Sequence, residues 1–408
     1  MRRALKIILT FLIPAFASAQ TVYTVPSGTK GDTLALPPFP SAREIILEVN
    51  ASCYTSGSML QYAYTVSNGV GAEQQISTFF VAVRSTAYSA LCDTSWHATR
   101  LQVGEPWPVF WFAMDSLSFI EPGEARDDFR IQSPDPPGIT LGYGQGWIVF
   151  SDSIEEREYA PGTNAVLFNS VRVWTIGPTA HPTEATPIAF LDSLRSSVER
   201  ARAIEWIAND PIAQKYAGLV DRIRAAVKQC ELNLARARID TVLQQASIDS
   251  SSTLTSEAYG LIRFNMEYLR DKLSPTGEVK GGVFMPSSGT LSVRAKPSVD
   301  FGPTDTLRCI VATVRWPAAC NVSLGSVTGT YGFAKFDSVV TLGKYRYQKF
   351  RTTTAQVLSW SAEGEYELFA VSVSGLCGAG SFELTNALPG GEWFVNVNYL
   401  DKTDPVFY

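Results

Sequence analysis

The chain has 408 residues, and a composition that is 45% apolar and 12% aromatic provides for two or three packed domains. A formal net charge of −5 without a basic cluster argues against nucleic acid as a partner. The two histidines and six widely spaced cysteines cannot build a short-spaced zinc site, so no cofactor is expected. Calcium bound by loop aspartates is a weaker alternative.

Residues 1–19 have the pattern of a cleavable secretory signal peptide. Arg2, Arg3 and Lys6 precede the apolar run 7–16, and small residues lie at 17–19. The run is too short to span a bilayer, and no later stretch of about twenty apolar residues follows. We therefore expect an exported chain, secreted or at the cell surface, whose mature form has no transmembrane segment.

Residues 20–176 carry the pattern of short β-strands. Apolar and polar side chains alternate along 60–66 and again along 79–83, which is the period of a half-buried strand. Further short apolar runs, separated by Gly and Pro, follow at 109–114, 129–131, 147–150 and 171–174. This spacing predicts an N-terminal β-sandwich of the immunoglobulin-like or jelly-roll kind.

Residues 188–274 carry the only long helical pattern, with apolar residues at steps of three and four. In the last helix, Thr255 is the expected N-cap, and Glu257 lies in the first turn, where the helix dipole favours a negative charge. A third, shorter helix is predicted to end at the serine-rich stretch 247–252. The apolar stripes predict a small helical bundle and its core.

The helical stretch also carries the motifs of a known family. The most specific is Leu254-Thr255-Ser256-Glu257-Ala258-Tyr259, and Ala201-Arg202-Ala203-Ile204-Glu205-Trp206-Ile207 precedes it. With these motifs, residues 185–274 resemble the FIMAH-type helical module of secreted, multidomain bacterial proteins. The resemblance implies a module that accompanies surface, adhesive or polysaccharide-active domains and has no known catalytic role of its own.

Two connections flank the helices: 177–187, rich in Pro and Thr and predicted to be a stiff linker, and 275–289, richer in Gly and Ser. Beyond them, residues 290–408 return to strand patterns and predict a C-terminal β-sandwich. Segments such as 313–317 and 382–386 resemble a β-domain that recurs on the C-terminal side of the helical module in secreted bacterial proteins. The general pattern of this region is loosely similar to cohesin-like sandwiches. The predicted fold is multidomain α+β, with a β-sandwich on each side of a small helical bundle.

Cysteine usage suits an oxidising compartment. Cys53 and Cys92 are the only pair in the first β region, so a disulfide is predicted between them. Cys320 and Cys377 are predicted to pair in the last region, because both lie near expected loops. The other two cysteines receive no assigned partner.

The sequence contains no recognisable catalytic constellation. A Ser-His-Asp triad would have to use His97, and no Gly-x-Ser-x-Gly elbow accompanies it. A glycosidase needs two facing carboxylates, whereas the acidic clusters at 127–128, 155–156 and 363–367 are of a kind that usually faces solvent. We therefore predict that the chain is not an enzyme, and a glycan-active hydrolase is the least favoured alternative.

The predicted function is interaction outside the cell. Export and domain order favour adhesion, matrix or polysaccharide attachment, with extracellular polysaccharide or cell-envelope components as partners. The alternative is a carbohydrate-binding accessory protein that stacks sugars on exposed aromatic rings. Candidate ligand-facing aromatics are Trp107, Trp147 and Trp393, and the competing interpretation for each is a place in a sandwich core.

Overall fold

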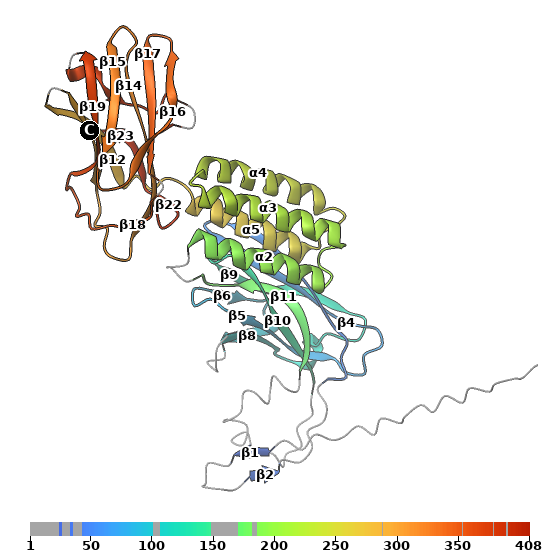
Figure 1. Ribbon diagram of the computed structural model, residues 1–408. Helices are drawn as coiled ribbons and strands as arrows, with labels where there is room; N and C mark the ends of the chain where they lie inside the picture. The colour runs from blue at the N-terminus through green and yellow to red at the C-terminus, as the bar shows by residue number, and fades with distance from the viewer. Residues whose placement is uncertain are drawn as a thin grey trace, which may run out of the picture.

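The computed structural model describes residues 43–100, 107–147, 170–181, 186–287, 289–352, 354–377, 379–388 and 391–408, and the paired strands β1 (Thr24–Pro26) and β2 (Thr33–Ala35). The predicted signal peptide lies outside the described residues. The helices form the middle of the molecule, and a strand-rich part lies on each side of them (Figure 1). The predicted multidomain α+β fold is confirmed.

The first sandwich consists of two antiparallel sheets, with strand orders β11-β10-β5-β8-β7 and β3-β4-β9-β6. Its strands are β3 (Leu47–Ser56), β4 (Met59–Asn68), β5 (Ile76–Val83), β6 (Ser89–Leu91), β7 (Trp96–Arg100), β8 (Trp107–Ala113), β9 (Ala125–Ser133), β10 (Pro137–Gly146) and β11 (Val171–Pro178). Every second residue from Tyr62 to Val66 is buried, as the alternation predicts. The two sheets meet where Phe79 of β5 contacts Tyr64 of β4 and Phe129 of β9, at ring distances of 5.9 and 5.5 Å.

The helical bundle contains α2 (Pro187–Ala203), α3 (Asp210–Lys228), α4 (Leu232–Asp249) and α5 (Ser256–Lys272). Thr255 caps α5 as predicted, because its hydroxyl accepts a hydrogen bond from the Ala258 amide. α4 is longer than predicted, since it continues through Ser247 to Asp249. The Asp249 carboxylate is buried and accepts a hydrogen bond from the Tyr216 hydroxyl at 2.7 Å, which anchors the last turn of α4 to α3.

The helical bundle shares an apolar contact with the first sandwich, called the first junction below. α5 packs against β3, β10 and β11, and α2 packs against β10 (Figure 1). Phe264 of α5 belongs to the core of the sandwich, whereas Ile139 of β10 belongs to the core of the helices. Gly260 allows the close approach, because a Cβ atom there would lie 3.3 Å from Cβ of Cys53.

Two buried polar side chains of α5 also bind strand backbone across the first junction. Glu257, which is 4% exposed, accepts a hydrogen bond from the Ala51 amide at 2.5 Å. Asn265 donates from Nδ2 to the Pro137 carbonyl at 2.8 Å. Because β3 is an edge strand, Glu257 pairs a backbone amide that no neighbouring strand reaches.

The second sandwich has one sheet with the order β15-β19-β13-β12-β23 and another with the order β16-β17-β14-β21-β22, and β18 and β20 also pair with β14. Its strands are β12 (Val279–Ser287), β13 (Thr290–Pro297), β14 (Thr306–Pro317), β15 (Asn321–Thr328), β16 (Phe333–Leu342), β17 (Tyr345–Thr352), β18 (Gln356–Val357), β19 (Tyr366–Leu376), β20 (Glu383–Leu384), β21 (Phe394–Val397), β22 (Leu400–Asp401) and β23 (Thr403–Phe407). Phe350 of β17 and Phe369 of β19 meet at a ring distance of 4.7 Å between the two sheets.

A disulfide connects the helical bundle to the second sandwich, at what we call the second junction. Cys230 in the turn between α3 and α4 pairs with Cys309 on β14. Cys230 has a φ of 60°, in the left-handed region that commonly ends helices. The sequence assigned no partner to either cysteine.

Other contacts at the second junction are few. Arg351 donates a hydrogen bond to the backbone oxygen of Gln229. The Arg236 guanidinium lies 3.9 Å from the Asp401 carboxylate. From the described part of the second sandwich, the side chains that pack against the core of the helices are the partly buried Phe394 and Tyr399.

Both predicted linkers are partly strand, which corrects the domain boundaries. Gly177 and Pro178 end β11, and the Ala180 amide still donates to the Arg84 carbonyl at 2.9 Å, so this connection is fixed to the first sandwich. Within 275–289, β12 pairs with both β13 and β23 and belongs to the second sandwich. The Pro, Thr, Gly and Ser content of these segments predicted linkers. It does not reveal the strands with which they pair, because those strands lie elsewhere in the chain.

The predicted disulfide between Cys53 and Cys92 is wrong, because both residues are free thiols. Cys53 lies on β3 and Cys92 directly follows β6, which are the opposite edges of one sheet. Three strand spacings amount to roughly 14 Å, well beyond the Cα separation that a disulfide tolerates. The predicted pairing of Cys320 with Cys377 is confirmed.

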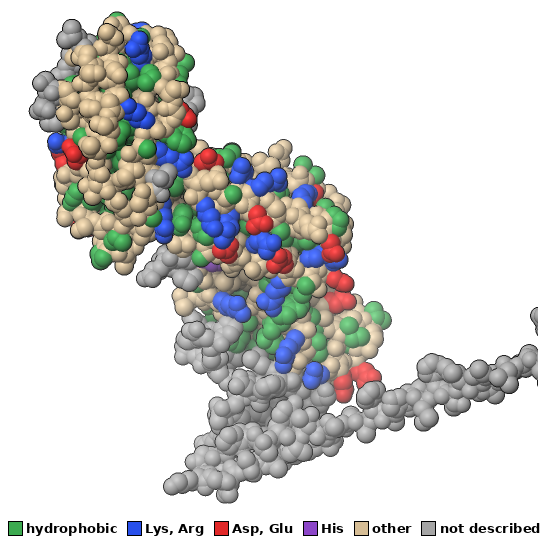
Figure 2. All heavy atoms as spheres, viewed as in Figure 1, with side chains coloured by type: hydrophobic (Ala, Val, Ile, Leu, Met, Phe, Trp, Pro, Cys, Tyr) green, Lys and Arg blue, Asp and Glu red, His purple; other side chains and the backbone are tan. Residues whose placement is uncertain are grey.

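Side chains of both charges cover the face of the helical bundle seen in Figure 2, whereas the same view of the second sandwich shows fewer of them. Among the described residues, no helix has both the length and the apolar character that crossing a bilayer requires.

Candidate functional site

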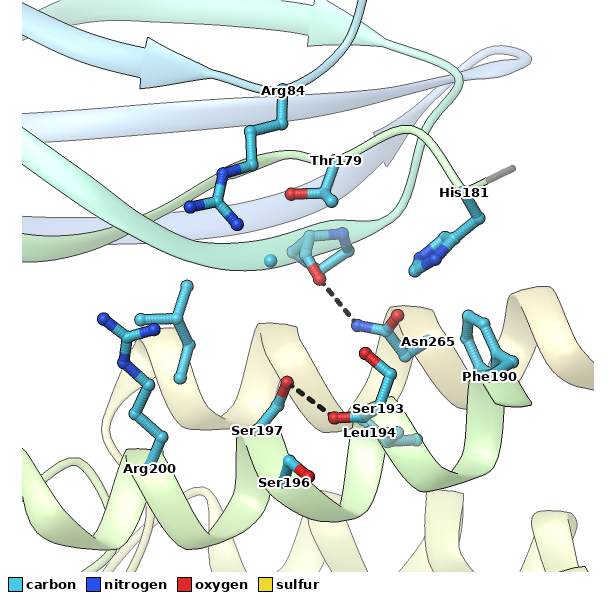
Figure 3. Close-up of a pocket in the computed structure, with 13 residues that line it drawn as sticks. Arg84, Thr179, His181, Phe190, Ser193, Leu194, Ser196, Ser197, Arg200 and Asn265 are labelled. Carbon is cyan, nitrogen blue, oxygen red and sulfur yellow. Dashed lines mark hydrogen bonds between the residues drawn. The ribbon is translucent and has the colours of Figure 1, made fainter. Parts of the chain in front are cut away.

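A pocket with both polar and apolar lining residues lies at the first junction, between α2 on one side and β10 with Thr179 directly after β11 on the other, and we call it the junction pocket (Figure 3). Its volume is about 240 Å³. This is below the range of about 300 to 1,000 Å³ that is usual for drug-sized ligands. The junction pocket therefore suits a small polar group, such as one unit of a longer polymer.

Two arginines give the junction pocket its charge. Arg84 directly follows β5, and its backbone amide donates to the Pro178 carbonyl at 3.2 Å. Arg200 extends from α2, with its guanidinium 4.2 Å from the centre of the Trp174 ring. Figure 3 shows the two arginine side chains at the same end of the pocket, reaching toward each other from opposite walls. The lining residues that the structure describes include no Asp or Glu.

Hydroxyl groups line the helical wall of the junction pocket. Ser196 donates to the Asp192 carbonyl at 3.1 Å, and Ser197 donates to the Ser193 carbonyl at 3.0 Å. These bonds use the hydroxyl hydrogens and leave oxygen lone pairs free to accept hydrogen bonds. Thr179 adds a hydroxyl from the sandwich side.

His181 lies at the other end of the junction pocket, beside Phe190 (Figure 3). Its ring centre lies 4.7 Å from that of Phe190 and 5.7 Å from that of Tyr268. Burial lowers the pKa of His181, although Asp135 and Asn265 oppose the shift. The lowered pKa favours the neutral imidazole at neutral pH.

A larger cleft, of about 650 Å³, lies at the second junction between α4 and the second sandwich. Its lining contains three basic and three acidic side chains: Arg236, Lys349, Arg351, Glu231, Glu392 and Asp401. Because these charges balance, this junction cleft has no clear preference for a ligand of either charge.

Asp401 is the buried carboxyl of the junction cleft, with 3% of its surface exposed. Burial raises its pKa, whereas hydrogen bonds from Thr403 and the charge of Arg236 oppose the rise. Its Oδ1 atom accepts the Thr403 amide at 3.1 Å. The carboxyl therefore binds backbone at the end of the second sandwich and is poorly accessible to a substrate.

Two of the candidate tryptophans, Trp147 and Trp393, lie in different sandwiches. Trp147 at the end of β10 is 49% exposed, and its ring lies 4.9 Å from that of Phe119. Trp393 is 3% exposed and donates its indole N–H to the Val279 carbonyl at 3.2 Å. It also belongs to the lining of the junction cleft, so its role as a ligand-facing residue stays a prediction. It packs against the backbone of β12, where Gly281 leaves room for the indole. The side chain of Trp107 lies outside the described residues.

Of the residues weighed for catalysis, those that the structure describes do not converge on one site. His97 is exposed on the edge strand β7, and its ring lies 5.1 Å from that of Phe112. Burial and the neighbouring Asp93 raise the pKa of Asp128, while Glu363 forms a surface ion pair with Lys296 at 2.9 Å. Positions 155–156 lie outside the described residues. No cluster of His, Cys, Asp and Glu with the arrangement of a metal site occurs in the described part of the chain.

Sequence reasoning missed the junction pocket. Arg84 and Arg200 are single arginines without a local motif, and His181 was assigned to a linker. Their proximity depends on the packing of α2 and α5 against β10 and β11, which no short sequence pattern records.

No protein-family model matches the sequence, and no curated protein matches it. Among solved structures, the chain is similar to the crystal structure of an uncharacterized protein from Nocardia farcinica that has an immunoglobulin-like fold. The identity is 14%, the match covers 33% of this chain and 98% of that chain, and the TM-score is 0.20. The assignment of two sandwiches therefore rests on the strand pairing and cores described above.

Proposed function

We propose that this chain is an exported, non-catalytic protein that attaches to polysaccharide or cell-envelope components outside the cell. The observation that carries the proposal is the junction pocket, whose described lining has hydroxyls and cations but no carboxylate. Such a lining can hold a polar polymer by hydrogen bonds, but it lacks the acid and base of a glycosidase.

Two further features support export and attachment. The disulfides Cys230–Cys309 and Cys320–Cys377 suit an oxidising compartment. The resemblance of 185–274 to a FIMAH-type module, and of the last region to cohesin-like sandwiches, would place the chain among secreted surface proteins. Trp147 supports the alternative, in which an exposed ring binds sugar by stacking.

The test is retention of the mature chain, residues 20–408, on insoluble polysaccharides and on washed cell envelopes of the host. We expect retention on at least one of these materials and no release of reducing sugar from any of them. Retention that is lost on Trp147→Ala would favour stacking on the first sandwich. Retention on none of them would contradict the attachment function, and release of sugar would contradict the non-catalytic assignment.

A further inference from the structure

We propose that the junction pocket is an anion site that holds the carboxylate or sulfate group of an acidic polysaccharide between Arg84 and Arg200. This inference rests on the proposed attachment function and names the chemical class of its ligand.

Charge is the first argument. The junction pocket is lined by two arginines and by no acidic residue among those described, although the whole chain has a net charge of −5. Neither Arg84 nor Arg200 forms an ion pair with any described residue, whereas Arg195 and Arg202 on the same helix both pair with carboxylates. The positive charge of the junction pocket is thus left available to an external anion.

Geometry is the second argument. Figure 3 shows Arg84 and Arg200 facing each other across one end of the pocket. Two like charges in that position repel, and an anion between them removes the repulsion. The planar fork of a guanidinium matches the two oxygens of a carboxylate or sulfate group.

The backbone of Arg84 and the guanidinium of Arg200 are held in place before a ligand arrives. The backbone of Arg84 is bonded at its amide to Pro178 and at its carbonyl to Ala180. The guanidinium of Arg200 stacks on Trp174. Less conformational freedom is therefore lost on binding than with two free surface arginines.

The rest of the lining fits a sugar rather than a free inorganic ion. The hydroxyls of Ser196 and Ser197 have lone pairs that can accept hydrogen bonds from sugar hydroxyls. The rings of His181 and Phe190, whose planes are 68° apart, form an aromatic wall at the other end. An acidic group at the arginine end and a sugar ring between the serines and this wall would use all parts of the pocket.

The experiment is calorimetric titration of residues 20–408 with three oligosaccharides of equal length: one of uronic acids, one of sulfated sugars and one neutral. We expect at least one acidic oligosaccharide to bind about tenfold or more tightly than the neutral one, since charge-assisted hydrogen bonds are the stronger kind. The uronate and sulfate titrations distinguish the two sources of negative charge. Equal binding of all three, or no binding of either acidic one, would overturn the inference.

Variants locate the site. Arg84→Gln and Arg200→Gln should each weaken acidic binding by about tenfold, and the double variant should abolish the preference over the neutral sugar. Arg200→Lys should retain part of the affinity, because it keeps the charge but loses the fork. The matched control is Arg202→Gln on the same helix, where the arginine pairs with Asp210 at 2.6 Å, and it should bind as the wild type does.

Unchanged binding in the double variant would overturn the inference, provided that thermal melts show the variant to be folded. The same variant separates this inference from the proposed function. If the double variant is still retained on the polysaccharide that retains the wild type, attachment stands and the junction pocket is not its site. If the wild type is not retained on any material, the attachment function itself fails.

Discussion

The helical bundle is joined to its two neighbours in different ways. At the first junction, Phe264 and Ile139 cross into each other's cores, and Glu257 and Asn265 bind strand backbone. At the second junction, the bundle is held by the Cys230–Cys309 disulfide, by few polar contacts and by partly buried side chains. We therefore expect the first sandwich and the helices to unfold together, whereas the second sandwich is connected to the helices by a covalent bond.

A substitution in the apolar contact of the first junction should reduce the free energy of unfolding more than any other change considered below. Phe264→Ala removes a side chain that is 4% exposed from the core of the first sandwich, so we expect a loss of about 3 to 5 kcal/mol. Urea unfolding should show the first sandwich and the helices losing structure in one earlier transition. Phe336→Ala on β16 is the matched control, because that ring is 41% exposed and its loss should cost far less. Equal effects of the two changes would show that the first junction is not a shared core.

Removing the disulfide should loosen the second junction. Replacing Cys230 and Cys309 together by Ser should cost about 2 to 4 kcal/mol and let the second sandwich move relative to the helices. Small-angle X-ray scattering should then show a larger and broader distribution of dimensions. Replacing Cys320 and Cys377 by Ser is the control, since that bond lies within one sandwich. An unchanged scattering curve without the Cys230–Cys309 bond would refute the distinction between the two junctions.

A single polar contact of the first junction should have a smaller effect. Glu257→Ala leaves the buried amide of Ala51 without its partner, which costs about 1 to 3 kcal/mol. Glu257→Gln keeps an acceptor oxygen and should lose less. Hydrogen exchange at Ala51 reports this bond directly, and exchange as slow as in the wild type would show that another group replaces the Glu257 carboxylate.

The smallest effect expected is at Asp401 in the second junction. Burial raises its pKa in the folded state, so its contribution to stability is fully present below the ordinary aspartate pKa of about 3.9 and falls as the pH rises through the folded value. Asp401→Asn removes this dependence. The free energy of unfolding of the variant, relative to that of the wild type, should increase from acidic to neutral pH by on the order of 1 kcal/mol. Melting curves at pH 3.5 and 7 measure the gain, and a variant that loses stability at pH 7 would show that the pairing with Arg236 outweighs the cost of burial.

Local patterns predicted the elements that depend on neighbouring residues. The alternation at 60–66 located β4, and Thr255 marked the start of α5 because a helix cap is a local feature. The same stretch could not indicate that Glu257 binds Ala51, since that contact depends on which strand forms the sheet edge.

Pairings across the molecule were beyond sequence reasoning. Cys53 and Cys92 looked like a pair because they share a domain, but the strand order puts them at opposite edges of a sheet. Cys230 and Cys309 lie 79 residues apart in different parts of the chain, so nothing local links them. The sequence did not predict that Arg84 and Arg200 line one pocket, because these residues are also far apart in the chain and no local motif links them.

The most direct test of attachment at the first junction is hydrogen exchange on residues 20–408 with and without the acidic polysaccharide that retains the protein. Binding in the junction pocket should slow exchange at the end of β11, around 177–181, and along α2, and leave the second sandwich unchanged. Protection confined to the second junction, or no protection at the first, would contradict the account.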